Sequence, residues 1–289
     1  MTTLTPSDRP STPALTPEPS AFADFLQETL ALSRRLFIQL QRRPSTLAAG
    51  IIQPLMWLIL FGALFQNAPQ GLFGDGINYG RFIGAGIIVF TAFGGALNAG
   101  LPVMFDREFG FLNRLLVAPL ASRYSIVMAS SIFITTLSLI QTAAIVAMSA
   151  ALGAGLPNLA GLALLTAIVL LLVLAVTALS LGLAFSLPGH IELIAVIFVT
   201  NLPLLFASTA LVPLSFMPTW LQWVASLNPL SYAIEPIRYV YLHPDWSVNS
   251  VVMQAPFGEV TLGAAMLVLL GFAAIALLII QPRLQKALS

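Results

Sequence analysis

The sequence has 289 residues, of which 58% are hydrophobic and only 8% are charged, with a formal net charge of +1 and no cysteine. Soluble domains carry about a quarter of charged residues, so this composition excludes an ordinary soluble domain and predicts a membrane-embedded chain. The lack of cysteine excludes disulfides, thiolate catalysis and cysteine-ligated metals.

Two segments precede the first apolar stretch. Residues 1–20 are rich in Pro, Ser and Thr, which predicts a disordered cytoplasmic tail. Residues 21–43 place apolar side chains at roughly helical spacing, with charged side chains between them, which predicts an amphipathic interface helix leading into the first span. Phe25, Glu28, Arg34 and Arg35 are its candidate contact residues. A docking role and a plain role as membrane anchor fit this pattern equally well.

Six stretches predict membrane spans, because about 20 apolar residues cross the hydrocarbon and a charge at its centre costs several kcal/mol. The run Tyr124–Ile191 is the clearest, since it holds no Asp, Glu, Lys or Arg and predicts two spans joined by a turn at Gly153–Asn158. The predicted spans are 47–65, 82–105, 124–152, 159–187, 193–216 and 260–280. Gln53, Asn98, Gln141 and Asn201 lie inside them, and hydrogen bonds to neighbouring helices are favoured over contacts with cargo.

The segment Pro218–Leu242 is apolar but interrupted, by Asn228-Pro229 and again by Glu235-Pro236. Each piece is too short to cross the bilayer, and tryptophan and tyrosine favour the headgroup level. We therefore predict two short helices that enter one leaflet or lie on its surface. The predicted fold is an all-α membrane protein with six transmembrane helices, an N-terminal amphipathic interface helix and this broken re-entrant or interfacial segment.

The positions of Lys and Arg predict the orientation. With six spans, ten of the twelve fall on the side of the two termini, and only Arg81 and Arg238 fall on the other side. The positive-inside rule then places both termini in the cytoplasm.

The cytoplasmic loop Phe105–Arg123 carries five charges and predicts a short helix, Asp106–Val117, ended by Pro119. Leu112, Leu115 and Leu116 give this helix an apolar patch. A docking helix needs an apolar ridge for a groove and charges that set its register, and this loop offers both. The alternative is a solvated connector whose arginines only set the topology.

Two motifs carry a family resemblance. Glu108-Phe109-Gly110, Leu115–Pro119 and Ser122-Arg123 resemble the cytoplasmic loop of ABC-2 type permeases, the membrane subunits of daunorubicin-resistance and Nod-factor exporters. The run Asn228–Arg238 is similar to the second signature of that family, and the resemblance extends from about Phe22 to the end. The chain departs from the family pattern at Asn113-Arg114, where a glutamate is common.

The resemblance implies a dimer with itself or a similar permease, seated on two copies of a separate ATPase subunit in the bacterial inner membrane. ATP and Mg belong to that partner, and this chain is expected to bind no cofactor, metal or nucleic acid. The resemblance assigns coupling to Asp106, Arg107, Glu108, Gly110, Arg114, Leu115, Leu116 and Pro119. It assigns an outer gate to Asn228, Pro229, Tyr232, Glu235 and Arg238.

No Walker A pattern is present, so the chain is not expected to hydrolyse ATP by the P-loop route or to act as an enzyme. The uncharged spans favour a hydrophobic or amphipathic cargo such as a drug, a lipid or a lipid-linked glycan. Two alternatives remain: a membrane scaffold or assembly protein, and a secondary transporter, which should place an ionisable residue near mid-span. For Glu235 and Arg238, a latch on the outer gate and a plain surface ion pair are equally open.

Overall fold

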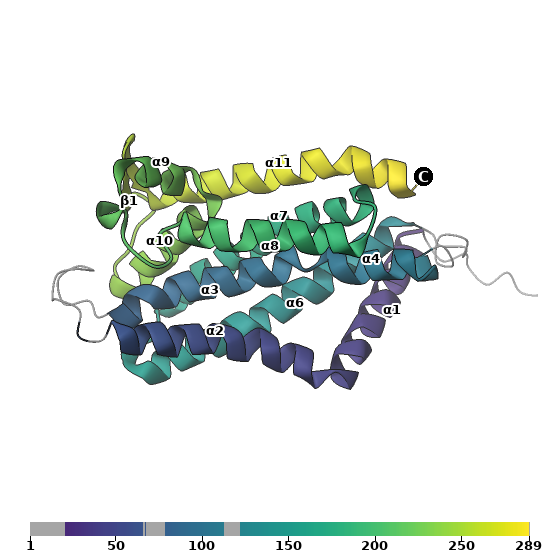
Figure 1. Ribbon diagram of the computed structural model, residues 1–289, viewed down its shortest axis with the longest axis horizontal. Helices are drawn as coiled ribbons and strands as arrows, with labels where there is room; N and C mark the ends of the chain where they lie inside the picture. Colours follow the sequence, from purple (N-terminus) through teal and green to yellow (C-terminus); the bar gives the residue numbers. More distant parts are fainter. Residues whose placement is uncertain (1–20, 66, 68–78, 113–121, 289) are drawn as a thin grey trace, which may run out of the picture.

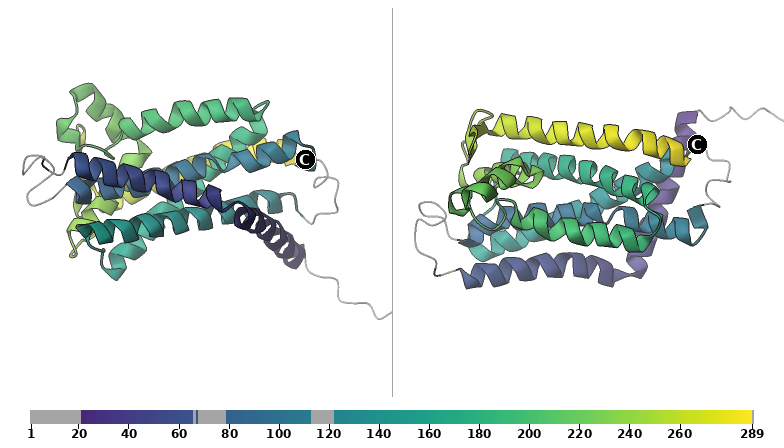
Figure 2. Two further views of the ribbon diagram at one scale, coloured as in Figure 1. Left: turned by 60° about the horizontal axis from the view of Figure 1, so that its bottom comes forward. Right: turned by 45° about the horizontal axis from the view of Figure 1, so that its top comes forward.

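The computed structural model describes residues 21–65, 67, 79–112 and 122–288. Most of its helices run along one long axis, while α1 crosses the bundle at one end (Figures 1 and 2). The elements are α1 (Ala21–Arg42), α2 (Pro44–Leu64), α3 (Tyr79–Leu97), α4 (Gly100–Glu108), α6 (Tyr124–Ser149), a π-helical turn (Ala150–Ala154), α7 (Leu159–Ser186), α8 (His190–Phe206), a 3-10 turn (Leu214–Phe216), α9 (Thr219–Leu227), α10 (Pro229–Leu242), β1 (Val251–Ala255), β2 (Gly258–Thr261) and α11 (Leu262–Leu288).

The predicted all-α membrane class is confirmed. Within the described residues, five helices are long and apolar enough to cross a membrane: α2, α3 continued by α4, α6, α7 and α11. The sixth apolar helix is α8, whose 17 residues span about 26 Å at 1.5 Å per residue. The hydrocarbon core is about 30 Å thick, so α8 is a short helix for that distance.

The core of the bundle forms around α3, which packs against α2, α6, α7 and α10. Ile83, Ile88 and Val89 on this helix are completely buried. In contrast, one face of α2 lies at the surface, because Met56 and Leu60 are more than half exposed. An apolar side chain that is exposed in this bundle faces lipid or another protein chain.

Three predicted boundaries are wrong. The fifth span was expected over 193–216, but α8 ends at Phe206, and the residues after it fold back against α3 and α10. The second break, at Glu235-Pro236, does not occur, because α10 continues through Pro236 while packed against α3, α7 and α11. The predicted surface position is also wrong for α10, whose side chains are mostly buried.

The third wrong boundary is the start of the last span. The prediction was Val260, but Val260 lies in β2, which pairs antiparallel with β1 in a short hairpin. The helix α11 begins only at Leu262, and the hydroxyl of Thr261 accepts a hydrogen bond from Ala264 N at 3.2 Å. A small β element thus joins α10 to the last helix of an otherwise helical fold.

The predicted amphipathic helix corresponds to α1. Its inner face packs on α6, where the rings of Phe37 and Phe133 meet edge to face with centroids 5.2 Å apart. Its outer face exposes Phe22, Leu26 and Leu30, four residues apart each, as an apolar stripe. An exposed apolar stripe on a helix that crosses the bundle end suits the boundary between headgroups and acyl chains.

Candidate functional site

The break between α3 and α4 sets the position of the predicted coupling loop. The hydroxyl of Ser180 in α7 donates to Leu97 O at 2.5 Å and accepts from Gly100 N at 2.9 Å. Gly100 lies so close to α7 that an added Cβ would be 2.5 Å from Ser180 O. Only glycine permits this approach, and α4 is therefore fixed against α7 at its first residue.

Asp106, near the end of α4, binds the amphipathic helix. Both of its carboxylate oxygens accept hydrogen bonds from the guanidinium of Arg35 in α1, each at 2.9 Å. The guanidinium also lies 3.9 Å from the ring centre of Phe111. A bidentate arginine–carboxylate pair is stronger and more directional than an ordinary hydrogen bond, so it holds α1 and α4 in one relative orientation.

Arg107, the next residue, binds the C-terminal end of α7. Its guanidinium donates to Ala184 O at 2.8 Å, to Leu187 O at 2.5 Å and to Pro188 O at 2.7 Å. Carbonyls at the end of a helix lack partners within that helix, and a cation there also complements the helix dipole. Arg107 thus attaches α4 to the turn between α7 and α8.

Glu108 binds the start of α8. One carboxylate oxygen accepts from His190 N at 2.6 Å, and the other lies 2.6 Å from His190 Nδ1. His190 is the first residue of α8, so the carboxylate occupies the position of a helix cap. Residues 106–108 are predicted coupling residues, and the structure connects each of them to a different helix.

The other coupling residues are placed in part. Gly110 has φ = 73°, a left-handed conformation that glycine adopts without strain directly after α4. The predicted helix start at Asp106 is wrong, because α4 already begins at Gly100 and ends at Glu108. Arg114, Leu115, Leu116 and Pro119 lie outside the described residues.

The predicted apolar patch differs from the observed one. Leu112, expected to face a partner, is only 3% exposed, whereas Phe109, directly after α4, is 80% exposed. Phe109 was part of the family motif but had no assigned role. Phe109 is thus an exposed aromatic side chain next to three charged residues that are bound to the bundle, and the sequence motif alone did not indicate this exposure.

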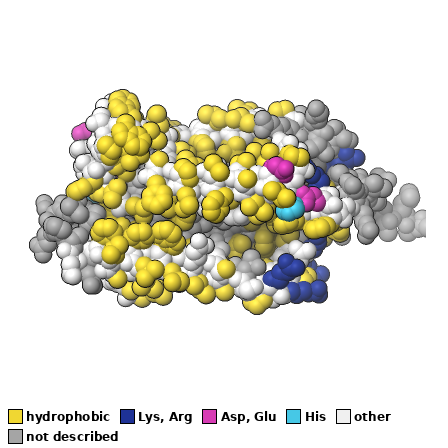
Figure 3. All heavy atoms as spheres, in the orientation of Figure 1, with side chains coloured by type: hydrophobic (Ala, Val, Ile, Leu, Met, Phe, Trp, Pro, Cys, Tyr) yellow, Lys and Arg dark blue, Asp and Glu magenta, His cyan; other side chains and the backbone are white. Residues whose placement is uncertain are grey.

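The interface-helix candidates divide between two environments. Glu28 faces the far end of the loop, where its carboxylate accepts from Ser122 N at 3.4 Å, while Arg35 holds the near end. Phe25 is half-buried and Arg34 is exposed. Figure 3 shows Lys, Arg, Asp, Glu and His side chains gathered at this end of the visible face. The charged end of the bundle is therefore the end at which α1 and the loop meet.

At the opposite end, Asn228 joins α8 to α10. Its Nδ2 donates to Leu204 O at 2.8 Å and to Ala207 O at 2.6 Å, which satisfies carbonyls at the end of α8. Its Oδ1 accepts from Leu230 N at 2.9 Å and so caps α10, in which Pro229 is the first residue. This asparagine explains why the apolar run divides here.

Arg238 lies in the core rather than at the surface, with 5% exposure. It forms an ion pair with Glu235, donates to Phe82 O at 3.2 Å and to Thr209 O at 2.6 Å, and lies 3.6 Å above the Phe82 ring. The surface-pair alternative for Glu235 and Arg238 is therefore wrong. Tyr232 is buried as well, at 7%.

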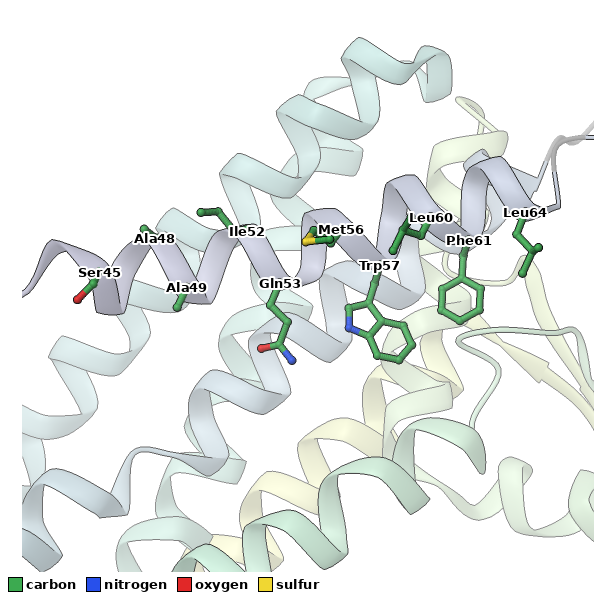
Figure 4. A pocket seen from close by; sticks show the side chains of 10 residues that line it. All are labelled: Ser45, Ala48, Ala49, Ile52, Gln53, Met56, Trp57, Leu60, Phe61 and Leu64. Carbon is green, nitrogen blue, oxygen red and sulfur yellow. The ribbon is translucent and has the colours of Figure 1, made fainter.

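A long groove runs along α2. It has a volume of about 830 Å³ and is lined by one helix: Ser45, Ala48, Ala49, Ile52, Gln53, Met56, Trp57, Leu60, Phe61 and Leu64. Figure 4 shows Gln53 on the same side as Trp57 and Phe61. The amide of Gln53 is exposed, so its predicted hydrogen bond to a neighbouring helix is not the arrangement found.

Comparisons with known proteins agree with the motifs. The sequence model described as "ABC-2 type transporter" matches residues 27–242. A protein of Porphyra purpurea named "Putative transport permease ycf38" is 57% identical over 248 residues, which cover 86% of this chain and 85% of the relative. The protein of the same name from Cyanophora paradoxa is 52% identical over 262 residues, with 91% and 90% covered. The "Probable doxorubicin resistance ABC transporter permease protein DrrC" of Mycobacterium tuberculosis is 26% identical over 224 residues, with 74% and 76% covered.

Proposed function

Because the chain belongs to the ABC-2 type transporter family, we propose that it exports a hydrophobic or amphipathic molecule across the membrane. Membership makes it the membrane subunit of an ABC transporter, and its partner is an ABC ATPase subunit. That partner binds ATP and Mg and hydrolyses the ATP. This chain supplies the transport pathway. Bacterial inner membrane is the proposed location.

The observation that carries the proposal is the connection of residues 106–108 to three helices. Asp106 binds α1, Arg107 binds the end of α7 and Glu108 binds the start of α8. A force applied to the loop or to α1 is therefore applied to α8 as well. An ATPase subunit that docks on exposed Phe109 and closes on ATP would move these elements together.

The pathway would run along α2 and α8. The groove on α2 is apolar except for Ser45 and Gln53, and α8 exposes Phe198 and Val199 by 71% each. These apolar faces suit a second permease copy or an apolar cargo. The residues described on them include no charged side chain that could bind an ion. We propose that two copies, identical or similar, meet over these faces and that the cargo passes along their seam.

The proposed orientation follows from the charges. The end of the bundle that carries α1 and the loop holds Arg35, Arg107 and Arg123, which the positive-inside rule assigns to the cytoplasm. Both termini would then be cytoplasmic. The Asn228–Arg238 helix would lie at the outer end, where a fixed, buried α10 would close the pathway from outside.

The experiment uses the tagged full chain with the ATPase subunit that copurifies with it, reconstituted in vesicles. Asp106→Asn removes one charge of the Arg35 pair, and a charge-assisted bond contributes about 1.5–3 kcal/mol. We expect ATP-driven export of an amphipathic fluorescent probe to fall about tenfold, because 1.4 kcal/mol corresponds to that factor. Insertion and ATPase copurification should stay normal.

Asp245→Asn is the matched control, since Asp245 is an exposed aspartate at the other end of the bundle. It should leave export unchanged. A chain that binds no ATPase subunit, or whose vesicles move no probe with ATP, would instead be a scaffold. Equal export by wild type and Asp106→Asn would remove the α1–α4 pair from the mechanism.

A further inference from the structure

A second cavity shares no lining residue with the groove on α2. It has a volume of about 220 Å³ and is formed by α3, α7, α8, α10 and α11. Figure 1 shows α7, α8 and α11 running along the same long axis of the bundle. The buried lining residues of the cavity include Phe93, Leu97, Leu172, Val176, Ile197 and Leu230.

The partly exposed lining residues of α8 and α11 place the mouth of the cavity between these two helices. Its rim is half-buried and includes Leu179 of α7, Val196 and Leu204 of α8, and Phe272 of α11. Just beyond the rim, α11 exposes Ile275 by 57%. The mouth is therefore continuous with an apolar outer surface on a helix long enough to span the membrane. In a bilayer, that surface contacts acyl chains.

The lining selects an apolar occupant. Of its two polar residues, Ser180 already uses its hydroxyl to donate to Leu97 O and to accept from Gly100 N. Among the described residues, no charged side chain lines the cavity. An apolar cavity of about 150 Å³ binds benzene, so a space of 220 Å³ accepts a hydrocarbon larger than that.

The volume of the cavity also distinguishes a lipid acyl chain from a complete cargo molecule as its occupant. Pockets for drug-sized molecules start at about 300 Å³. The cavity is smaller than this, and it is long rather than round, since Val196 and Leu204 are eight residues apart on α8 and thus about 12 Å apart along its axis. A narrow apolar slot of this length suits one flexible chain better than a complete cargo molecule.

The geometry points to a binding site for the end segment of one acyl chain of a bilayer phospholipid between α8 and α11. The chain packs against Val196 and Leu204 on one side and Phe272 on the other. It fills the inner side of α8, the helix whose first residue is held by Glu108. The site requires only a bundle embedded in a bilayer and is independent of the direction of transport and the nature of the cargo.

The probe is phosphatidylcholine with a diazirine at the end of one acyl chain. The full chain is reconstituted with it, extracted into mild detergent, irradiated and mapped by mass spectrometry. Chains at the outer surface are exchanged for detergent, while a chain in the cavity is retained. We expect label at Leu179 and Phe272 and about tenfold less at exposed Ile275, a ratio equivalent to 1.4 kcal/mol.

Two variant pairs test the occupant. Val196→Phe fills the cavity and should lower the label at Phe272 about tenfold, whereas Ile194→Phe, on the exposed face of the same helix, should not change it. Should Val196→Phe fail to fold, Phe272→Ala widens the cavity and should raise the label at Leu179, with Ile275→Ala as its control.

Two results would overturn the site. One is equal labelling of Phe272 and Ile275 that neither variant pair changes, which means surface contact only. The other is a cavity labelled by a free hydrophobic photoprobe but not by the phospholipid, which means a different ligand. Export by the reconstituted complex is measured separately, so failure of the lipid site leaves the proposed function standing.

Discussion

Glu235→Ala in α10 removes the counterion of Arg238, a side chain that is only 5% exposed. The guanidinium keeps its hydrogen bonds to Phe82 O and Thr209 O and its contact with the Phe82 ring. Removing one partner of a buried ion pair costs about 3–5 kcal/mol, because the other charge stays desolvated. With two carbonyl acceptors left, we expect a loss of about 3 kcal/mol of unfolding free energy.

The assay is equilibrium unfolding in mixed detergent micelles with increasing sodium dodecyl sulfate, followed by tryptophan fluorescence. Glu259→Ala is the control, because Glu259 is an exposed acid near the same end, and its change should stay within about 0.5 kcal/mol. Glu235→Ala combined with Arg238→Met removes both charges. That double variant should be more stable than the sum of the single variants predicts by about 1–3 kcal/mol.

A result in which Glu235→Ala behaves like Glu259→Ala, and in which the double variant is additive, would refute the reasoning. It would mean that water reaches Arg238, as expected for a gate that stands open. A large single effect with strong coupling means that α10 is a fixed part of the core. Any opening at this end of the bundle must then move α10 together with the segment around Thr209.

Three further predictions concern Gly100, Arg107 and Gln53. Gly100→Val should destabilise the fold by about 1–3 kcal/mol, because its side chain meets Ser180 O, while Gly94→Val, with nothing within 4 Å, should be nearly neutral in the same unfolding assay. Arg107→Lys keeps the charge but replaces the two nitrogens that bind separate carbonyls by a single nitrogen, so ATP-driven export in vesicles should fall about tenfold with normal insertion; full export would exclude this contact from coupling. Gln53→Leu makes the α2 groove wholly apolar along its middle and should weaken export of amphipathic probes relative to apolar ones; an unchanged ratio would place the pathway elsewhere.

The parts of the fold that the sequence predicts are those that follow from local rules. Absence of charge identifies the long helices, and helical spacing of apolar residues identifies α1. The division at Asn228-Pro229 also follows from local chemistry, since asparagine caps a helix and proline suits its first residue. Each of these signals lies within about one helix of chain, which is why it can be seen without the tertiary structure.

The parts that were missed depend on tertiary contacts. Residues after Phe206 are as apolar as those before, so hydropathy gives no end for α8; the end is set by Asn228, 22 positions later. The helix α10 passes Pro236 because the surrounding bundle packs on it, which outweighs the local cost of proline. In the sequence, Ser180 is one small residue within a long apolar run. Only its hydrogen bond with Gly100 shows that it joins α7 to the start of α4.

The coupling residues illustrate the same point for function. Successive residues of an α-helix point roughly 100° apart, so three consecutive side chains at a helix end face three directions. Asp106, Arg107 and Glu108 use this geometry to reach α1, the end of α7 and the start of α8. A partner that only bound these charges would have to break the contacts that connect the loop to the bundle. If the proposed function holds, we expect the docking surface to include neighbouring exposed groups such as Phe109, while the three charged residues connect the loop to the bundle.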